Sequence, residues 1–114
     1  MKDDIKEIKS FEFAKRIIKL YKYLTTEKKE YILSKQLLRS GTSIGANIRE
    51  AKYGVSRGDY HNKLMIALKE ANESQYWIDL LEEEYLTKEE VRSLQEDIKE
   101  LIKILVSITK KTKE

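Results

Sequence analysis

The chain has no cysteine and no proline, and its 114 residues include only four glycines and one histidine. Without cysteine there is no disulfide framework, no thiol nucleophile and no thiolate metal site, and the composition fits a reducing cytoplasm. The lack of proline, together with 38% charged residues, favours long helices with charged outer faces over a sheet-rich fold.

Long apolar runs are also absent. No uncharged apolar run approaches the roughly 18 residues that a membrane span needs. The first seven residues, MKDDIKE, lack the apolar core of a signal peptide. We therefore expect a cytoplasmic protein with no membrane partner, folded as a single domain over residues 1–114.

Signs of catalysis are weak, because the chain has a single histidine, His61. Ser56 or Ser43 could form a Ser-His-carboxylate site with His61, but the sequence has no nucleophile elbow and no glycine-rich oxyanion turn. Gly41 and Gly45 follow no strand, so they do not form a phosphate-binding loop. We expect no catalytic residue, no enzyme activity and no cofactor.

A two-metal carboxylate site is an alternative, since helical bundles can hold one. Such a site needs Glu-x-x-His on two helices and a further Glu from each of the others. The chain offers Glu70, Glu73 and Glu50, but no Glu-x-x-His. At 100° per residue, Glu70 and Glu73 point away from the apolar seam of their helix. We expect no metal, and expect these carboxylates to pair with basic residues within the subunit or across an interface, namely Arg39, Arg49 or Lys63.

Apolar residues at spacings of three and four predict four helices. Their expected ranges are about 10–24, 27–53, 57–84 and 88–110. Helices of this length joined by short loops predict an all-α fold, an antiparallel up-and-down four-helix bundle.

Capping residues predict where these helices begin and end. Ser10 is expected to cap the first helix after a frayed or loosely helical segment 1–9, and Thr25 or Thr26 to end it and cap the next. Gly54 is expected to end the second helix. Ser56 and Thr87 each open a capping box, at residues 56–59 and 87–90. The tail 110–114 is expected to be disordered.

The second helix contains an unusual number of small residues, in the run LLRSGTSIGANIREAKYG at 37–54. Each glycine costs about 1 kcal/mol in a helix relative to alanine, so only tertiary packing would keep this segment helical. Asn47, at the edge of the apolar arc, is expected to form a hydrogen bond inside the bundle or across an interface. Small residues in that arc would let a neighbouring helix approach closely. The arc consists of Leu33, Leu37, Gly41, Ile44, Ile48 and Ala51.

The run RSGTSIGANIREA at residues 39–51 resembles the signature of the 23S ribosomal RNA intervening-sequence protein family, also known as four helix bundle proteins. The match continues to Trp77 and covers about residues 11–108, with Gly45 where many relatives have proline. The resemblance implies a small bundle that assembles into a ring, often a pentamer. It also implies a gene linked to insertions in rRNA genes, relatives that accompany reverse transcriptases, and structural roles for Glu50 and Glu73.

The third helix has apolar residues on a second side. Ile66, Trp77 and Leu80 point away from its seam, and Tyr76 and Met65 lie at the edge. A solitary bundle would leave these side chains exposed, so we expect a homo-oligomer whose interface includes Ile66, Tyr76, Trp77 and Leu80.

Charge is unevenly spread along the chain. Residues 1–63 carry 15 basic and 8 acidic residues, and residues 64–114 carry 8 and 12. The asymmetry fits either a nucleic-acid face or a basic half that meets the acidic half of the next subunit. Exposed tyrosines could stack on bases or pack at an interface. The residues expected to bind RNA or DNA are Lys15, Lys19, Lys22, Lys35, Arg39, Arg49, Lys52 and Arg57. The competing hypothesis is a protein-interaction scaffold, for example accessory to a reverse transcriptase, without nucleic-acid binding.

Overall fold

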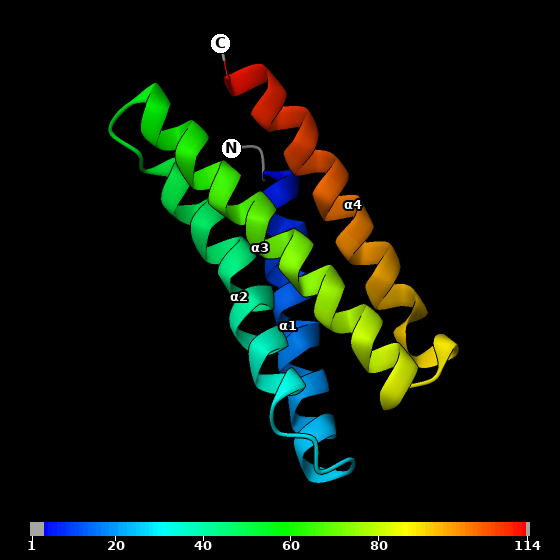
Figure 1. The fold of residues 1–114 in the computed structure, drawn as a ribbon. Helices are drawn as coiled ribbons and strands as arrows, with labels where there is room; N and C mark the ends of the chain where they lie inside the picture. The colour runs from blue at the N-terminus through cyan, green and yellow to red at the C-terminus, as the bar shows by residue number, and fades with distance from the viewer. Residues whose placement is uncertain (1–3, 114) are drawn as a thin grey trace.

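The computed structural model describes residues 4–113, which fold as four α-helices and contain no strand (Figure 1). The helices are α1 (Ile5–Thr26), α2 (Leu33–Lys52), α3 (Arg57–Glu84) and α4 (Lys88–Thr112). Consecutive helices run in opposite directions, so the predicted all-α four-helix bundle is confirmed. No helix within residues 4–113 is long and apolar enough to cross a bilayer.

The first helix begins earlier than predicted. Asp4 is its N-cap and accepts a hydrogen bond from the Lys6 backbone N–H at 3.0 Å. Ser10 does not cap the helix: it is fully buried one turn inside, and its hydroxyl donates to the Glu7 carbonyl. A side chain added at Gly45 of α2 would come within 3.2 Å of the Ser10 hydroxyl, so this part of α1 is held by close helix packing. Residues 1–3 of the predicted frayed segment lie outside the described range.

The second helix begins six residues later than predicted, at Leu33. Thr25 and Thr26 extend α1 instead, with their hydroxyls donating to carbonyls one turn back. The loop at 27–32 is closed by the buried carboxylate of Glu30, which accepts the backbone N–H groups of residues 32, 33 and 34 at 2.7–3.0 Å. Glu30 therefore does the capping that the prediction assigned to a threonine.

The ends of α3 and α4 agree better with the sequence. Ser56 accepts a hydrogen bond from the Asp59 N–H at 3.1 Å. Thr87 and Glu90 form the reciprocal pair of bonds of a complete capping box, at 2.8 and 3.2 Å. The prediction of a disordered tail is wrong for residues 110–112, which are helical, and Glu114 lies outside the described range. Gly54 directly follows the C-cap of α2, Tyr53, so the helix ends within two residues of the predicted position.

The core confirms the apolar arc predicted for α2. All its members are buried except Leu33, which is partly buried. Gly41 shows why small residues are needed there, because an added Cβ would lie 3.0 Å from a side-chain carbon of Ile17. The α2 helix packs closely on both α1 and α3, whereas α1 and α4 are the least closely packed neighbours. The α1–α2 and α3–α4 loops lie at one end of the bundle, opposite both termini (Figure 1).

Candidate nucleic-acid interface

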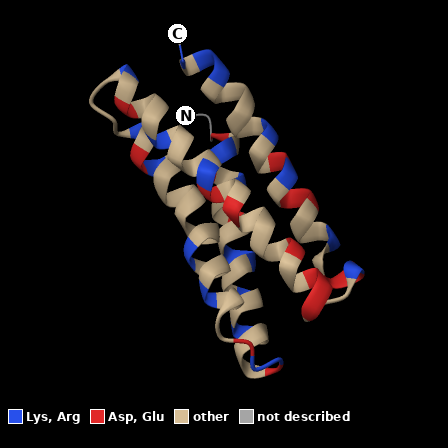
Figure 2. Ribbon diagram, in the orientation of Figure 1, with Lys and Arg blue, Asp and Glu red and all other residues tan. Residues whose placement is uncertain are grey.

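The eight basic residues predicted to bind nucleic acid are spread along the whole length of the bundle. Lys22 and Lys35 flank the α1–α2 loop at one end of the bundle, and Lys52 and Arg57 flank the α2–α3 loop at the other (Figure 2). The antiparallel course of α2 separates the two sets, since one lies at its start and the other at its end. The predicted set therefore reaches both ends of the bundle, with its other four members on α1 and α2 between them.

Ion pairs within the chain occupy half of the predicted set. Arg39 contacts Glu70 at 3.2 Å and also Glu73, and Arg49 and Lys52 lie 3.5 and 3.6 Å from Glu7. Lys15 pairs with a glutamate one turn away on α1. Within residues 4–113, the predicted basic residues that form no ion pair are Lys19, Lys22, Lys35 and Arg57.

The α1–α2 loop adds two lysines that the sequence analysis missed, Lys28 and Lys29. Both are exposed, and neither is in an ion pair within the described part of the chain. They were overlooked because residues 27–32 were assigned to a helix, whereas exposed loops often carry binding residues. We call the set formed by Lys22, Lys28, Lys29 and Lys35 the basic tip.

The backbone of the basic tip is held in a defined shape. Burial alone would raise the pKa of the Glu30 carboxyl, but the backbone N–H groups that it accepts hold that pKa below its ordinary value. Lys29 has a φ of 54°, in the left-handed region, which costs a non-glycine residue about 1 kcal/mol. The loop therefore holds its lysines on a fixed frame.

The other loop at the same end of the bundle is acidic. Glutamates gather at the end of α3 and the start of α4 (Figure 2), at positions 82, 83, 84, 89 and 90. Tyr23 of α1 donates a long hydrogen bond, 3.4 Å, to Glu90 across this boundary. An anionic polymer approaching this end would thus be drawn to the α1–α2 side and repelled from the α3–α4 side.

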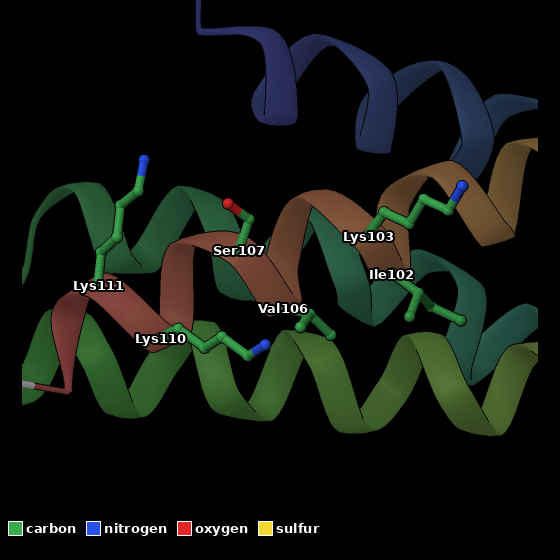
Figure 3. Close-up of a pocket in the computed structure, with 6 residues that line it drawn as sticks. All are labelled: Ile102, Lys103, Val106, Ser107, Lys110 and Lys111. Carbon is green, nitrogen blue, oxygen red and sulfur yellow. The ribbon is translucent and has the colours of Figure 1, made fainter.

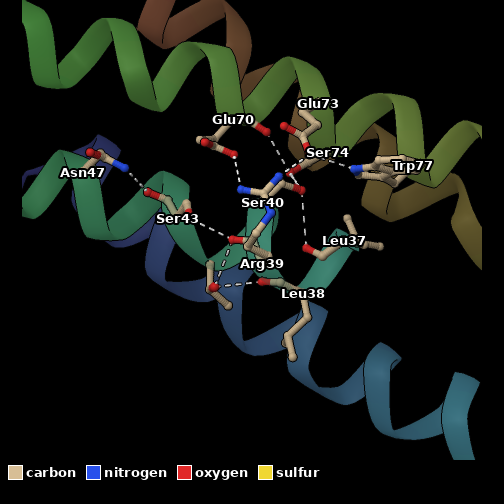
Figure 4. A network of polar contacts seen from close by, with 11 residues as sticks. Leu37, Leu38, Arg39, Ser40, Ser43, Asn47, Glu70, Glu73, Ser74 and Trp77 are labelled. Carbon is tan, nitrogen blue, oxygen red and sulfur yellow. Dashed lines mark hydrogen bonds and ion pairs between the residues drawn. The ribbon is translucent and has the colours of Figure 1, made fainter. Parts of the chain in front are cut away.

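A network of polar contacts joins α2 to α3 (Figure 4). Arg39 bridges Glu70 and Glu73, and the Trp77 indole N–H donates to Glu73 at 3.1 Å. The hydrogen bond from Trp77, followed by the contact with Arg39, holds the pKa of Glu73 below its ordinary value, although partial burial opposes this. A bond to Glu73 likewise raises the pKa of Arg39. These carboxylates serve as ion-pair partners, as the sequence analysis predicted.

Other polar residues of the signature run have structural contacts. Glu50 pairs with Lys63 at 2.8 Å, one of the three basic partners that were predicted for these carboxylates. The Asn47 amide donates to the Ser43 carbonyl at 2.9 Å, within its own helix. The buried bond between the hydroxyls of Ser40 and Ser74, 2.8 Å long, was not foreseen. No group of three or more His, Asp or Glu residues in residues 4–113 is arranged to hold a metal ion.

The predicted interface residues of α3 differ in exposure. Tyr76 is 57% exposed and Ile66 38%, and Met65 beside them is also exposed. Trp77 and Leu80 are half-buried, and Trp77 packs on the core with its ring edge-on to Tyr76. The outer side of α3 thus offers a partly apolar surface to a partner, although Trp77 is more covered than expected.

A second apolar surface, missed from the sequence, lies between α1 and α2. Phe11 and Ile18 are exposed and line a groove of about 490 Å³ together with Thr42, Gly45 and Ala46 of α2. We call it the α1–α2 groove. Its depth follows from the small residues of α2, which leave space beside the larger side chains of α1.

A shallower pocket of about 460 Å³ lies on α4 (Figure 3). Ile102 and Val106 form its apolar part, with Lys103, Lys110 and Lys111 around them. Two of these lysines are in the last turn of α4, where the helix dipole favours cations. The helix dipole thus accounts for these two lysines, and this end of α4 is far from the basic tip (Figure 1).

Comparison with known proteins gives a family and a fold. The chain matches the 23S rRNA-intervening sequence protein family over residues 5–107. It is similar to a protein of unknown function from the S23 ribosomal protein family of Bacteroides thetaiotaomicron, whose crystal structure superimposes with a TM-score of 0.90. The two are 57% identical over 92% of this chain and 98% of the other. No curated protein matches the chain.

Proposed function

Since the chain belongs to the 23S rRNA-intervening sequence protein family, we propose that it is a non-catalytic, homo-oligomeric protein that binds the phosphate backbone of RNA or DNA. The basic tip supports this proposal most directly. It places four exposed lysines around one ordered loop, and none of them is neutralised by an ion pair within residues 4–113.

The expected mode of binding is electrostatic. Each lysine that contacts a phosphate releases a condensed counterion, so the affinity falls as salt is added. For single strands the slope of log affinity against log salt is about −0.7 per phosphate, so one basic tip with four contacts would give about −3. The acidic α3–α4 end would orient the polymer by repulsion.

Assembly into a ring, with five copies as the resemblance implies, is the second part of the proposal. The apolar surface of α3 and the α1–α2 groove are different faces, as a head-to-tail contact between successive copies requires. In a ring whose axis runs along the helices, every basic tip lies on the same rim. Several weak sites on one rim would bind one strand with higher avidity.

The test is a salt titration of binding to a fluorescein-labelled RNA of 20 nucleotides, followed by anisotropy. The double variant Lys22→Glu/Lys35→Glu is expected to lose about tenfold or more in affinity at 50 mM salt and to show a shallower salt slope. The matched control is Lys99→Glu/Lys103→Glu on α4, with the same charge change away from the tip. Equal losses in both double variants would contradict the placement of the site.

A protein-interaction scaffold is the second candidate, and the exposed α1–α2 groove favours it. An apolar groove of this kind suits a helix of a protein partner better than a phosphate backbone. An intact oligomer that binds no RNA or DNA at 25 mM salt would support the scaffold and reject nucleic-acid binding.

A further inference from the structure

The α1–α2 loop exposes two large apolar side chains next to each other. Tyr31 is 58% exposed and Ile32 is 74% exposed. Neither is in the core or among the side chains packed against it. The fold therefore gives no packing reason for an aromatic and a β-branched residue at these two positions.

Their exposure does not come from a loose loop. The Glu30 N–H donates to the Leu24 carbonyl at 2.9 Å, and the Ser34 hydroxyl donates to the Glu30 carbonyl at 2.8 Å. The Glu30 carboxylate accepts three more backbone N–H groups, including that of Ile32. Because folding already orders this loop, little of its conformational entropy remains to be lost when a partner binds, which favours binding to a preformed surface.

In the sequence, lysines lie on both sides of the two apolar residues. Lys28 and Lys29 precede Tyr31, and Lys35 follows it in the first turn of α2. A second tyrosine, Tyr23, lies beneath the Lys28 ammonium, which is 5.9 Å from its ring centre. Aromatic faces interleaved with cations are the pattern by which proteins hold single-stranded nucleic acids, with bases stacking on the rings and phosphates meeting the cations.

We propose that the basic tip is a binding site for single-stranded nucleic acid, in which Tyr31 stacks on an unpaired base and the lysines contact the flanking phosphates. The inference rests on the proposed function and narrows its partner to unpaired segments such as loops and strand ends. A duplex keeps its bases stacked inside, so it can use the lysines but not Tyr31. The ring of Tyr31 accounts for the preference for single strands over duplexes, and the lysines account for most of the salt dependence of the affinity.

The experiment compares three labelled probes, oligo(U) and oligo(dT) of 20 nucleotides and an RNA duplex of 20 base pairs, by anisotropy at 50 mM salt. Tyr31→Ala is expected to weaken binding of both single strands about tenfold, with little change for the duplex and an unchanged salt slope. Tyr31→Phe keeps a stacking face and is expected to retain wild-type affinity. Tyr53→Ala is the matched control, because Tyr53 is also exposed but lies at the opposite end of the bundle.

The outcomes separate this inference from the function on which it rests. Equal binding of single strands and duplex by the wild type, or a Tyr31→Ala variant that binds oligo(U) normally, would overturn the single-strand site and leave backbone binding standing. Failure of the wild type to bind any probe at 25 mM salt would overturn both and would assign the tip to a protein partner. A loss with oligo(U) but not oligo(dT) would support the site and limit it to RNA.

Discussion

The α2–α3 seam and the α1–α4 seam join helices of similar length by different means. Across the first, Ser40 and Ser74 meet through buried hydroxyls 2.8 Å apart, and Arg39 reaches the nearly buried Glu70. Across the second, the polar contacts lie near the surface, such as the ion pair of Arg16 with a carboxylate oxygen of α4 at 2.6 Å. Small side chains bring two helices together, whereas long charged ones bridge a wider gap.

The comparison shows where stability is concentrated. A side chain inserted between closely packed helices must displace both of them. A buried carboxylate that loses its basic partner is left with a charge that neither a cation nor water compensates. A surface ion pair contributes about 0–1 kcal/mol, because water replaces much of what is lost. We expect changes at the α2–α3 seam to affect the free energy of unfolding far more than equivalent changes at the α1–α4 seam.

The largest effect is expected for Ser40→Leu, which places a branched side chain in the buried α2–α3 seam. Overpacking, together with loss of the hydroxyl contact, should lower the free energy of unfolding by about 3 kcal/mol. Urea denaturation followed by circular dichroism measures this. The matched control is Ser93→Leu on α4, where the exposed hydroxyl contacts Arg16 across the α1–α4 seam. A comparable loss in both variants would contradict the difference between the seams.

Arg39→Ala is expected to have the next largest effect, about 2 kcal/mol, because it leaves the nearly buried Glu70 without its cation. Part of this loss should return in Arg39→Ala/Glu70→Gln, whose amide carries no charge to be compensated. Arg16→Ala, at the α1–α4 seam, is expected to cost about 0.5 kcal/mol. Equal costs for the two arginines in urea denaturation would argue against a special role for the network.

The pH dependence of stability should depend on the Arg39–Glu73 contact of the α2–α3 seam. Because the pKa of Glu73 is lowered in the folded state, its contribution is present above the ordinary value of 4.5 and is lost as pH falls through the folded value. Glu73→Gln is therefore expected to reduce the decline in unfolding free energy between about pH 5 and pH 3. Denaturation at several pH values measures it. The control is Glu96→Gln on α4, and an unchanged profile for Glu73→Gln would reject the assignment.

The smallest effect on unfolding, below about 0.5 kcal/mol, is expected for Tyr76→Ala, since its side chain is mostly exposed at the outer edge of α3. The same change should lower the oligomer order, as measured by light scattering with size exclusion. Trp77→Ala should lower it too, and should also destabilise the subunit because Trp77 packs on the core. A Tyr76→Ala variant with wild-type assembly would remove this surface from the proposed interface.

Local chemistry explains which helix ends could be predicted. The start of α4 follows from Thr87 and Glu90, whose capping contacts span only three residues. The start of α2 could not be found in this way, because a glutamate that folds back over its own loop does the capping. Serine is a preferred N-cap residue, so the sequence predicts Ser10 as a cap. The structure instead buries Ser10 inside α1, where a side chain added at Gly45 of α2 would come within 3.2 Å of its hydroxyl.

The same distinction holds for the candidate site. The sequence analysis predicted that Glu50, Glu70 and Glu73 pair with basic residues, within the subunit or across an interface, and all three pair within the chain. Face geometry along α3 was wrong for Glu70, which is nearly buried rather than directed away from the core. Face geometry along single helices could not predict that Glu7 of α1 lies near Arg49 and Lys52 of α2, since that depends on how two helices are placed side by side. Which lysines form no ion pair within residues 4–113, among them the four of the basic tip, was therefore visible only in the folded chain.

The sequence by itself determined the helical class, the buried arc of α2, the bounds of α3 and the family, because these depend on periodicity and on contacts between residues a few positions apart. Only the tertiary structure decided which cations are neutralised, how far Trp77 is covered, and that Tyr31 and Ile32 stand exposed on an ordered loop. These depend on distances of a few ångströms between helices, which small residues such as Gly41 and Ser40 set through packing.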